Sequence, residues 1–239
     1  MSENPSSRWT ARNTAVPQVD IDVGLRQYML RVYNYMAGGL ALTGIVAYFA
    51  AASGLYVSLA HTPLIWLIVL APLGLVLFLQ FRINSMSLGA AQASYWAYAG
   101  LVGLSLGFIF LVYTSASIAA TFFICAAMFA AMSLWGYTTK RDLTGMGSFL
   151  FMGLIGIVIA SLVNMFLHSP GLQFAISFIG VIVFTGLTAW DTQQIKEMYW
   201  AGDGAAVAGK KAIMGALRLY LDFLNLFLML LQFMGARRN

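Results

Sequence analysis

Two aspartates occupy positions where a charge is costly. Of the eight acidic residues in the chain, only Asp191 and Asp222 fall inside or at the edge of a long apolar stretch. Asp191 follows directly after the apolar residues 172–190, and Asp222 lies near the middle of residues 212–234. An ionisable side chain in a membrane segment is expensive to bury and marks a candidate functional site. We therefore expect these two carboxylates to carry the chemistry of the protein.

A polar stripe accompanies Asp222 along the last apolar stretch. Its members recur at helical spacing and so share one face of a helix: Arg218, Asp222, Asn225, Met229 and Gln232. Because the other faces of this helix are apolar, the stripe must contact protein or water and not lipid. Asp191 on the preceding stretch is the obvious group for it to meet.

A pair of close carboxylates in a low-dielectric site cannot lose both protons cheaply, and it titrates as a unit. With a shared proton, Asp191 and Asp222 would hold two helices together. Without it, they would repel each other and attract a cation, and carboxylate oxygens are the ligands that Ca²⁺ prefers. The pair therefore predicts a pH-gated cation path in which the two aspartates sense protons and bind Ca²⁺ transiently.

Arg82 is a third candidate, because it stands where the second apolar stretch ends, on the same side of the membrane as Asp191. A charge-assisted pair between Arg82 and a carboxylate would latch a closed state. The alternative is that Arg82 only anchors a helix end among the headgroups.

The aspartates also have structural interpretations. Arg218 and Asp222 are four residues apart and could pair within one helix, while Asp191 with Gln194 resembles a capping box. Depth is a further difficulty, because Asp191 lies roughly 7 Å along a helix from Lys196, whereas Asp222 lies about 16 Å from Lys211. The two carboxylates can meet only if the last helix begins a turn or two outside the bilayer.

Composition places the chain in a membrane. Charged residues make up 9% of the sequence and hydrophobic residues 61%, whereas soluble domains average about 25% and 45–50%. We expect an all-α integral membrane protein. Residues 1–24 are polar and predict a disordered cytoplasmic tail, residues 25–31 a short juxtamembrane helix, and residues 25–239 together one transmembrane domain. Its seven apolar stretches are residues 32–53, 63–81, 91–113, 117–136, 146–167, 172–190 and 212–234.

The distribution of positive charge predicts the topology. Every Lys or Arg in the tail and loops that precede the seventh stretch lies on one side, which predicts a cytoplasmic N-terminus: Arg8, Arg12, Arg26, Arg31, Arg82, Lys140, Arg141, Lys196, Lys210 and Lys211. Because these charges are spread over several loops, no nucleic-acid partner is expected. The seventh stretch is ambiguous, since a full span would leave Arg237 and Arg238 outside.

Three segments resemble the Bax-inhibitor, or transmembrane Bax inhibitor motif, family. They are FTGLTAWDTQQIK at 184–196, ALRLYLDFLNLFL at 216–228 and, similar to bacterial members, LRVYNYM at 30–36. The resemblance implies six helices around a central seventh and a pH-sensitive Ca²⁺ leak controlled by a di-aspartyl pair, here Asp191 and Asp222. It also implies an arginine latch at Arg82, although bacterial members often have an arginine cluster where this chain has Arg82 followed by Ile83 and Asn84.

The leading hypothesis is thus a calcium leak channel in a bacterial inner membrane, with no cofactor beyond the passing ion. One alternative is a non-conducting regulator that binds other membrane proteins; the resemblance implies a modulator of a membrane protease or a suppressor of cell death. Another is a proton-coupled transporter. An enzyme is not expected. The helices lack the Gly-x-Gly-Asp motif of intramembrane aspartyl proteases, and the two histidines, His61 and His168, lie in separate loops.

Overall fold

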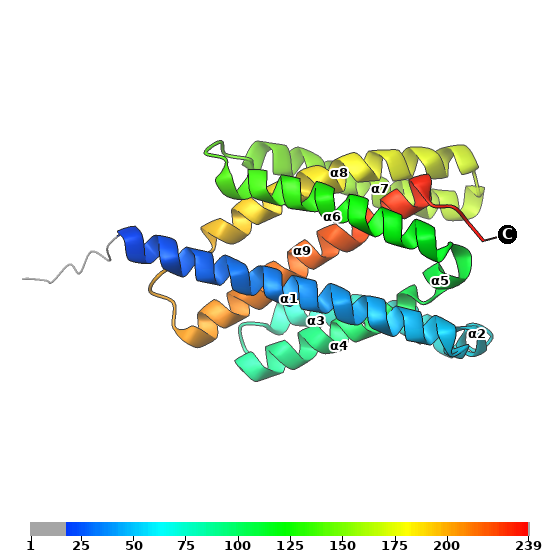
Figure 1. Ribbon diagram of the computed structural model, residues 1–239, viewed down its shortest axis with the longest axis horizontal. Coiled ribbons are helices and arrows are strands. Elements are labelled where there is room, and N and C mark those ends of the chain that lie inside the picture. Colours follow the sequence, from blue (N-terminus) through cyan, green and yellow to red (C-terminus); the bar gives the residue numbers. More distant parts are fainter. Residues whose placement is uncertain (1–17, 239) are drawn as a thin grey trace, which may run out of the picture.

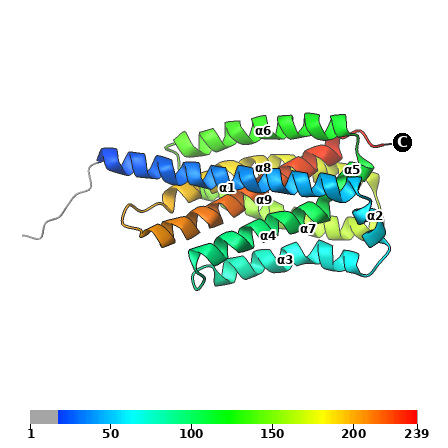
Figure 2. The ribbon, with the colours of Figure 1, turned by 60° about the horizontal axis from the view of Figure 1, so that its bottom comes forward.

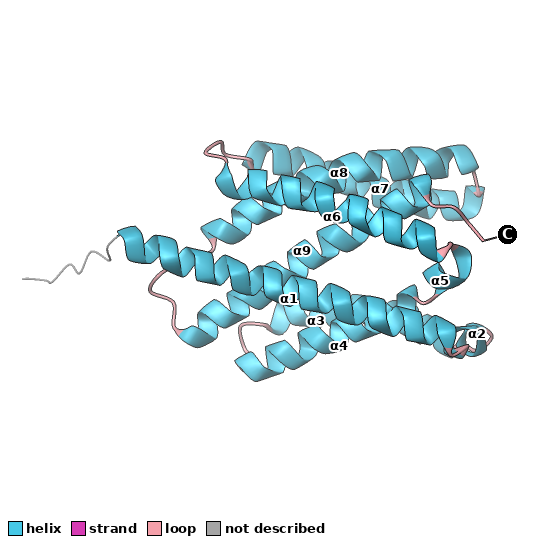
Figure 3. Cartoon of the chain, viewed as in Figure 1, coloured by secondary structure: helices cyan, strands magenta, loops and turns pink. Residues whose placement is uncertain are grey.

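The protein is a helical bundle. The computed structural model describes residues 18–238, which are helical almost throughout and form no β-strand (Figure 3). Within this range the helices are α1 (Gln18–Ala52), α2 (Leu55–Ala60), α3 (Leu64–Arg82), α4 (Leu88–Leu106), α5 (Phe108–Val112), α6 (Ser115–Thr138), α7 (Thr144–Leu167), α8 (Pro170–Glu197) and α9 (Ala205–Met234). Seven spans in this range, with α4 and α5 forming one, are long and apolar enough to cross a membrane. The predicted fold class is confirmed.

The last helix, α9, occupies the centre of the bundle (Figures 1 and 2). In its most apolar segment 61% of the residues are buried inside the protein, against 11% in the outermost helix, α3. Helices α1, α4, α6 and α8 pack directly on α9, while α3 packs on α4 and α7 on α8. The expected arrangement of six helices around a C-terminal seventh is therefore present, with α3 and α7 in outer positions.

The first helix begins earlier than the sequence suggested. Helix α1 is continuous from Gln18, so residues 18–24 do not belong to the predicted tail, and residues 25–31 are not a separate juxtamembrane helix. Gly24, where the break was expected, lies in the helix against the hydroxyl of Tyr199. A Cβ at this position would collide with that hydroxyl, which explains why the residue is glycine. The predicted disorder of residues 1–17 lies outside the described residues.

Side-chain caps define where several spans begin. The hydroxyls of Ser87, Thr114 and Ser169 accept hydrogen bonds from the N–H groups of Ala90, Ser117 and Leu172, at 3.2, 3.3 and 3.3 Å. Each satisfies a donor that the first turn of a helix leaves free. Ser169 is followed by Pro170, which suits a first helical turn because its ring fixes φ. The Ser169 cap and Pro170 set the start of α8, the helix that carries Asp191.

Helix α9 crosses the whole bundle, so the two ends of the described chain lie at opposite ends of the molecule (Figure 1). Beyond α9 the chain is held at the turn between α5 and α6. The backbone N–H of Arg238 donates to the Val112 carbonyl at 2.8 Å, and that of Thr114 donates to Ala236 at 3.1 Å. A single continuous helix that crosses the bundle favours a span for the seventh stretch over a segment that re-enters and returns.

Candidate functional site

Helices α8 and α9 run antiparallel, and their register brings the two aspartates together. Two glycines allow the close approach. A Cβ at Gly180 would come within 2.7 Å of the Met229 sulfur, and one at Gly215 within 2.9 Å of Ile195 Cγ2. Between these contacts, the carboxyl groups of Asp191 and Asp222 lie within hydrogen-bonding reach of each other. The site is thus a carboxyl pair in the interface of two spanning helices.

The third member of the site is Arg218. Its Nη1 lies 3.8 Å from Asp191 Oδ1, which is too long for a hydrogen bond but close enough for strong Coulomb attraction. Exposure differs sharply among the three residues. The Arg218 side chain is 46% exposed and that of Asp191 14%, whereas Asp222 is buried. Asp222 Oδ2 has no hydrogen-bond partner among the described residues.

The depth difficulty is resolved by the lengths of the two helices. Helix α9 begins at Ala205, about two turns before the apolar stretch that starts at residue 212. Helix α8 continues past Asp191 to Glu197. Asp191 therefore lies in the interior of α8, and the capping-box interpretation is wrong. Arg218 pairs across the interface with Asp191, and no ion pair with Asp222 on its own helix occurs in the part of the chain that the structure covers.

Gln232, at the far end of the polar stripe, also meets α8, as expected of a face that cannot contact lipid. Gln232 Oε1 accepts hydrogen bonds from Gln173 Nε2 at 2.6 Å and from Ser177 Oγ at 3.2 Å. Asn225 instead donates from Nδ2 to the Leu221 carbonyl of its own helix at 2.8 Å. Asn225 is half-buried, and its hydrogen bond does not involve either carboxyl group.

Arg82 lies apart from this site. It is the last residue of α3, its side chain is exposed, and it forms no ion pair with any residue of the described range. Helix α3 is an outer helix that packs on α4. The contact that a latch at Arg82 requires is absent from this conformation, and its role stays a prediction. The position it was expected to hold beside a carboxylate is occupied by Arg218.

A chain of hydroxyl groups next to Asp191 was not anticipated from the sequence. The hydroxyls of Tyr33 and Ser133 are 2.7 Å apart, and those of Ser133 and Thr192 are 2.9 Å apart. Thr192 donates in turn to the Thr188 carbonyl at 2.7 Å. This chain links α1, α6 and α8 beside the carboxyl pair. Hydroxyl residues are common in membrane helices, so no sequence signal distinguishes these three.

The other acidic side chains described by the structure lie in loops or at a helix end and have partners. Asp203 pairs with Lys211 at 2.6 Å, and Glu197 accepts a hydrogen bond from Gln194 at 3.2 Å. In the α6–α7 loop, hydrogen bonds from the Thr144 side chain and backbone lower the pKa of Asp142. The contrast isolates Asp222 as a buried carboxyl group with an unsatisfied oxygen.

The pair offers a cation an incomplete set of ligands. No cluster of three or more His, Cys, Asp or Glu side chains that could hold a metal occurs between residues 18 and 238. Ca²⁺ takes six to eight oxygen ligands, and two carboxyl groups supply only part of that shell.

Comparison with known sequences identifies the family. The sequence model described as inhibitor of apoptosis-promoting Bax1 matches residues 25–239. The chain belongs to this Bax-inhibitor family. Among bacterial relatives, RP147 of Rickettsia prowazekii is 53% identical over 91% of this chain and 93% of its own length. Inner membrane protein YbhL of Escherichia coli K12 is 52% identical over 90% of this chain and 94% of its own. A protein of Caulobacter vibrioides is 44% identical over 99% of this chain and its full length. This Bax-inhibitor protein therefore matches its relatives along nearly all of their lengths.

Proposed function

We propose that this protein is a pH-sensitive calcium leak channel of a bacterial inner membrane, gated by protonation of Asp191 and Asp222. The observation that carries the proposal is the position of the two carboxyl groups, within hydrogen-bonding reach across the interface of the central helix α9 and its neighbour α8. The name of the relative YbhL, an inner membrane protein, supports the location. The basic loops at the N-terminal end of the bundle support a cytoplasmic N-terminus.

In this mechanism, a proton shared by Asp191 and Asp222 keeps the ion path closed. Protonated on one oxygen, the pair forms a hydrogen bond between α8 and α9 and so holds the helices in contact. When that proton leaves, two negative charges face each other in a low-dielectric interface and repel strongly. The helices then separate locally, and the carboxylate oxygens, including the unpartnered Asp222 Oδ2, become ligands for an entering cation.

Arg218 sets the balance of charge at the site. Among the described residues, the charged groups that act on the pair are the two aspartates themselves and Arg218. Fully deprotonated, the pair carries two negative charges against one positive charge. The excess negative charge is what attracts a divalent cation, while Arg218 prevents the site from holding a proton too tightly to open. Its exposure puts it at the water-facing side of the pair.

The proposal is tested by Ca²⁺ entry into liposomes that contain the purified protein and a fluorescent indicator. Entry is recorded from about pH 6 to pH 8, a range in which a buried carboxyl pair can titrate. The wild type is compared with Asp191→Asn and Asp222→Asn, and Glu197→Gln at the end of α8 serves as the matched control. We expect entry to rise with pH in the wild type and the control, and to lose its pH dependence in both Asn variants.

Three results would overturn the proposal or its mechanism. Entry that is equal and independent of pH in all four proteins would show that the pair does not gate a path. No entry above empty liposomes would remove the channel and favour the alternative of a non-conducting regulator, which would tolerate the Asn substitutions as long as it folds. Entry that rises toward low pH would retain a channel but reject the shared proton as what keeps the path closed.

A further inference from the structure

Two apolar hollows follow one another along the seam between α1 and α6, with α9 at their base. One has a volume of about 720 Å³ and the other about 580 Å³, and both are lined by Met36 and Phe223. The larger continues along α1 through Leu40 and Gly44, and the smaller runs in the other direction toward Arg26. Together they form one elongated depression, called here the α1–α6 groove.

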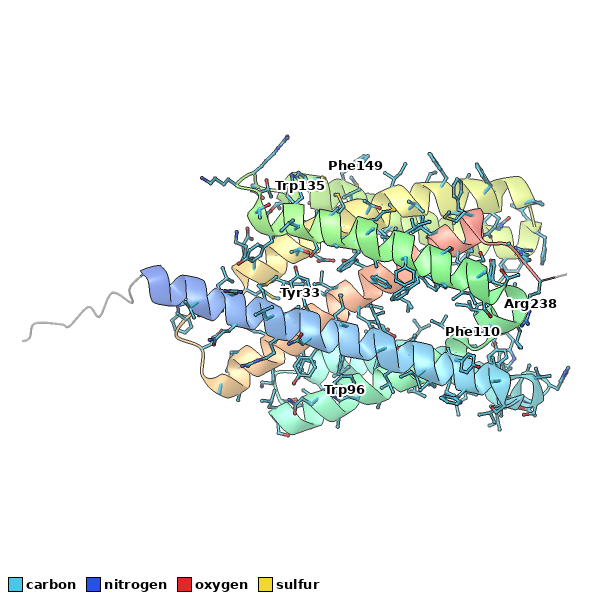
Figure 4. All side chains as sticks on the ribbon, in the orientation of Figure 1. Tyr33, Trp96, Phe110, Trp135, Phe149 and Arg238 are labelled. Carbon is cyan, nitrogen blue, oxygen red and sulfur yellow. The ribbon has the colours of Figure 1, made fainter. Side chains whose placement is uncertain are left out.

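The groove is open toward the side of the bundle that meets lipid. Residues on its rim are well exposed, with 70% of Phe123 and 63% of Leu134 accessible. Gly44 points into open space, because a Cβ added there would meet no atom within 4 Å. Tyr33 lies between α1 and α6 (Figure 4), and its hydroxyl is 2.7 Å from that of Ser133. The α1–α6 groove is thus closed at its base and open along its outer side.

Positive charge is concentrated at one end of the groove. Arg26 lines the smaller hollow and is exposed. Across the groove, Lys196 Nζ donates to the Tyr137 carbonyl at 2.8 Å and lies 5.3 Å from the centre of the Tyr137 ring, and Tyr137 also lines the hollow. Both cations belong to the end of the bundle that carries the basic loops. The α1–α6 groove is therefore apolar along its length and positively charged at one end, which suits an amphipathic molecule.

We propose that the α1–α6 groove binds one anionic phospholipid, with an acyl chain along the groove and its phosphate at Arg26. A lipid acyl chain is apolar, as the hydrocarbon of the bilayer is, and so matches the apolar lining of the groove. The cationic mouth favours an anionic headgroup over a zwitterionic one, as basic residues near a membrane surface do. A partner helix fits less well. A helix is about 10–12 Å across, and to lie between α1 and α6 it would have to break the Tyr33–Ser133 hydrogen bond that joins the two walls.

This inference is independent of the proposed channel, because none of its residues belongs to the carboxyl pair. It is tested by native mass spectrometry of the full-length protein in detergent, after incubation with equal amounts of phosphatidylglycerol and phosphatidylcholine. We expect the wild type to retain phosphatidylglycerol about fivefold more than phosphatidylcholine, the preference that one basic residue confers. Thermal unfolding, measured in parallel, confirms that each variant is folded.

Two pairs of variants locate the lipid. Gly44→Phe fills the groove, and Gly74→Phe is its control, since Gly74 on α3 also faces open space but lies outside the groove. Arg26→Gln removes the cation, and Arg31→Gln is its control, an exposed arginine of the same helix that does not line the groove. We expect Gly44→Phe to lose the retained lipid several-fold and Arg26→Gln to lose the preference for phosphatidylglycerol, while both controls behave as the wild type.

Three results would overturn the proposal. Equal retention of the two lipids by the wild type would reject the headgroup site. Unchanged retention in folded Gly44→Phe would place the lipid elsewhere. A wild type that is dimeric by mass, with Gly44→Phe monomeric, would show that a second copy of the chain occupies the groove.

Discussion

At the scale of single residues, the site depends on which arginine stands beside the carboxyl pair. Arg218 lies 3.8 Å from Asp191, whereas Arg82 ends the outer helix α3, exposed and far along the fold from α8. A charge beside a carboxylate favours its ionised form, and a half-exposed charge does so less strongly than a buried one because water screens it. The proton on the pair should therefore respond to Arg218 and not to Arg82.

Replacing Arg218 with Gln tests this point. Without the positive charge, nothing offsets the repulsion between the two deprotonated carboxyl groups, so the midpoint of Ca²⁺ entry should move to higher pH. Arg82→Gln is the matched control and should leave the midpoint unchanged. The measurement is the liposome assay from acid to alkaline pH. A shift in the Arg82 variant with none in the Arg218 variant would restore Arg82 as the latch.

At the scale of helices, α8 is held in register by close approaches to its neighbours. Gly136 of α6 packs against the backbone carbonyl of Ala189, two residues before Asp191, and a Cβ at Gly136 would collide with it. Gly147 of α7 leaves room in the same way for the ring of Trp190. Small residues at helix crossings let backbones approach closely in membrane proteins. These glycines therefore position the carboxyl-bearing turn of α8 from two sides.

Gly136→Ala should destabilise the bundle, because the contact at this position is backbone and cannot move aside as a flexible side chain would. Overpacking of this kind costs about 1–3 kcal/mol, which corresponds to a fall of roughly 5 °C in Tm for a chain of this size. The control is Gly156→Ala on α7, where a Cβ would meet no atom within 4 Å and where alanine improves helix propensity. Thermal unfolding in one detergent compares the two. Equal melting temperatures would mean that α6 and α8 can move apart without cost.

At the scale of the whole molecule, α9 carries the C-terminal residues to the end of the bundle opposite the basic loops. Figure 4 shows Arg238 at that end, near Phe110, and its Nη1 donates to the Phe110 carbonyl at 3.0 Å. Two arginines are thus placed against the general bias of positive charge. The free-energy cost of placing Arg237 and Arg238 at this end is reduced because both follow the last span. Arg238 also donates hydrogen bonds to backbone carbonyls.

The topology predicts opposite labelling of two engineered cysteines. Ala201→Cys lies in the exposed loop between α8 and α9, and Ala236→Cys lies beyond α9. In intact spheroplasts, a membrane-impermeant maleimide should modify Ala236→Cys at once and Ala201→Cys only after permeabilisation. The native Cys125 is buried, so the wild type should stay unlabelled. Labelling of both positions from the same side would show that α9 does not span.

The sequence by itself determined the membrane class, the seven spans and the two aspartates, because the energetics of burial in a bilayer act on each segment separately. Twenty apolar residues predict a helix without knowledge of its neighbours, and a lone carboxylate in such a segment is conspicuous. The tertiary structure decided what depends on pairs of segments. The register of α8 against α9 brought Asp191 to Asp222 and Arg218, and the packing of α3 on α4 placed Arg82 apart from them. It also showed that α9 crosses the bundle as one continuous helix, and it revealed the α1–α6 groove, because register and grooves arise from side-chain packing between helices that are distant in the sequence.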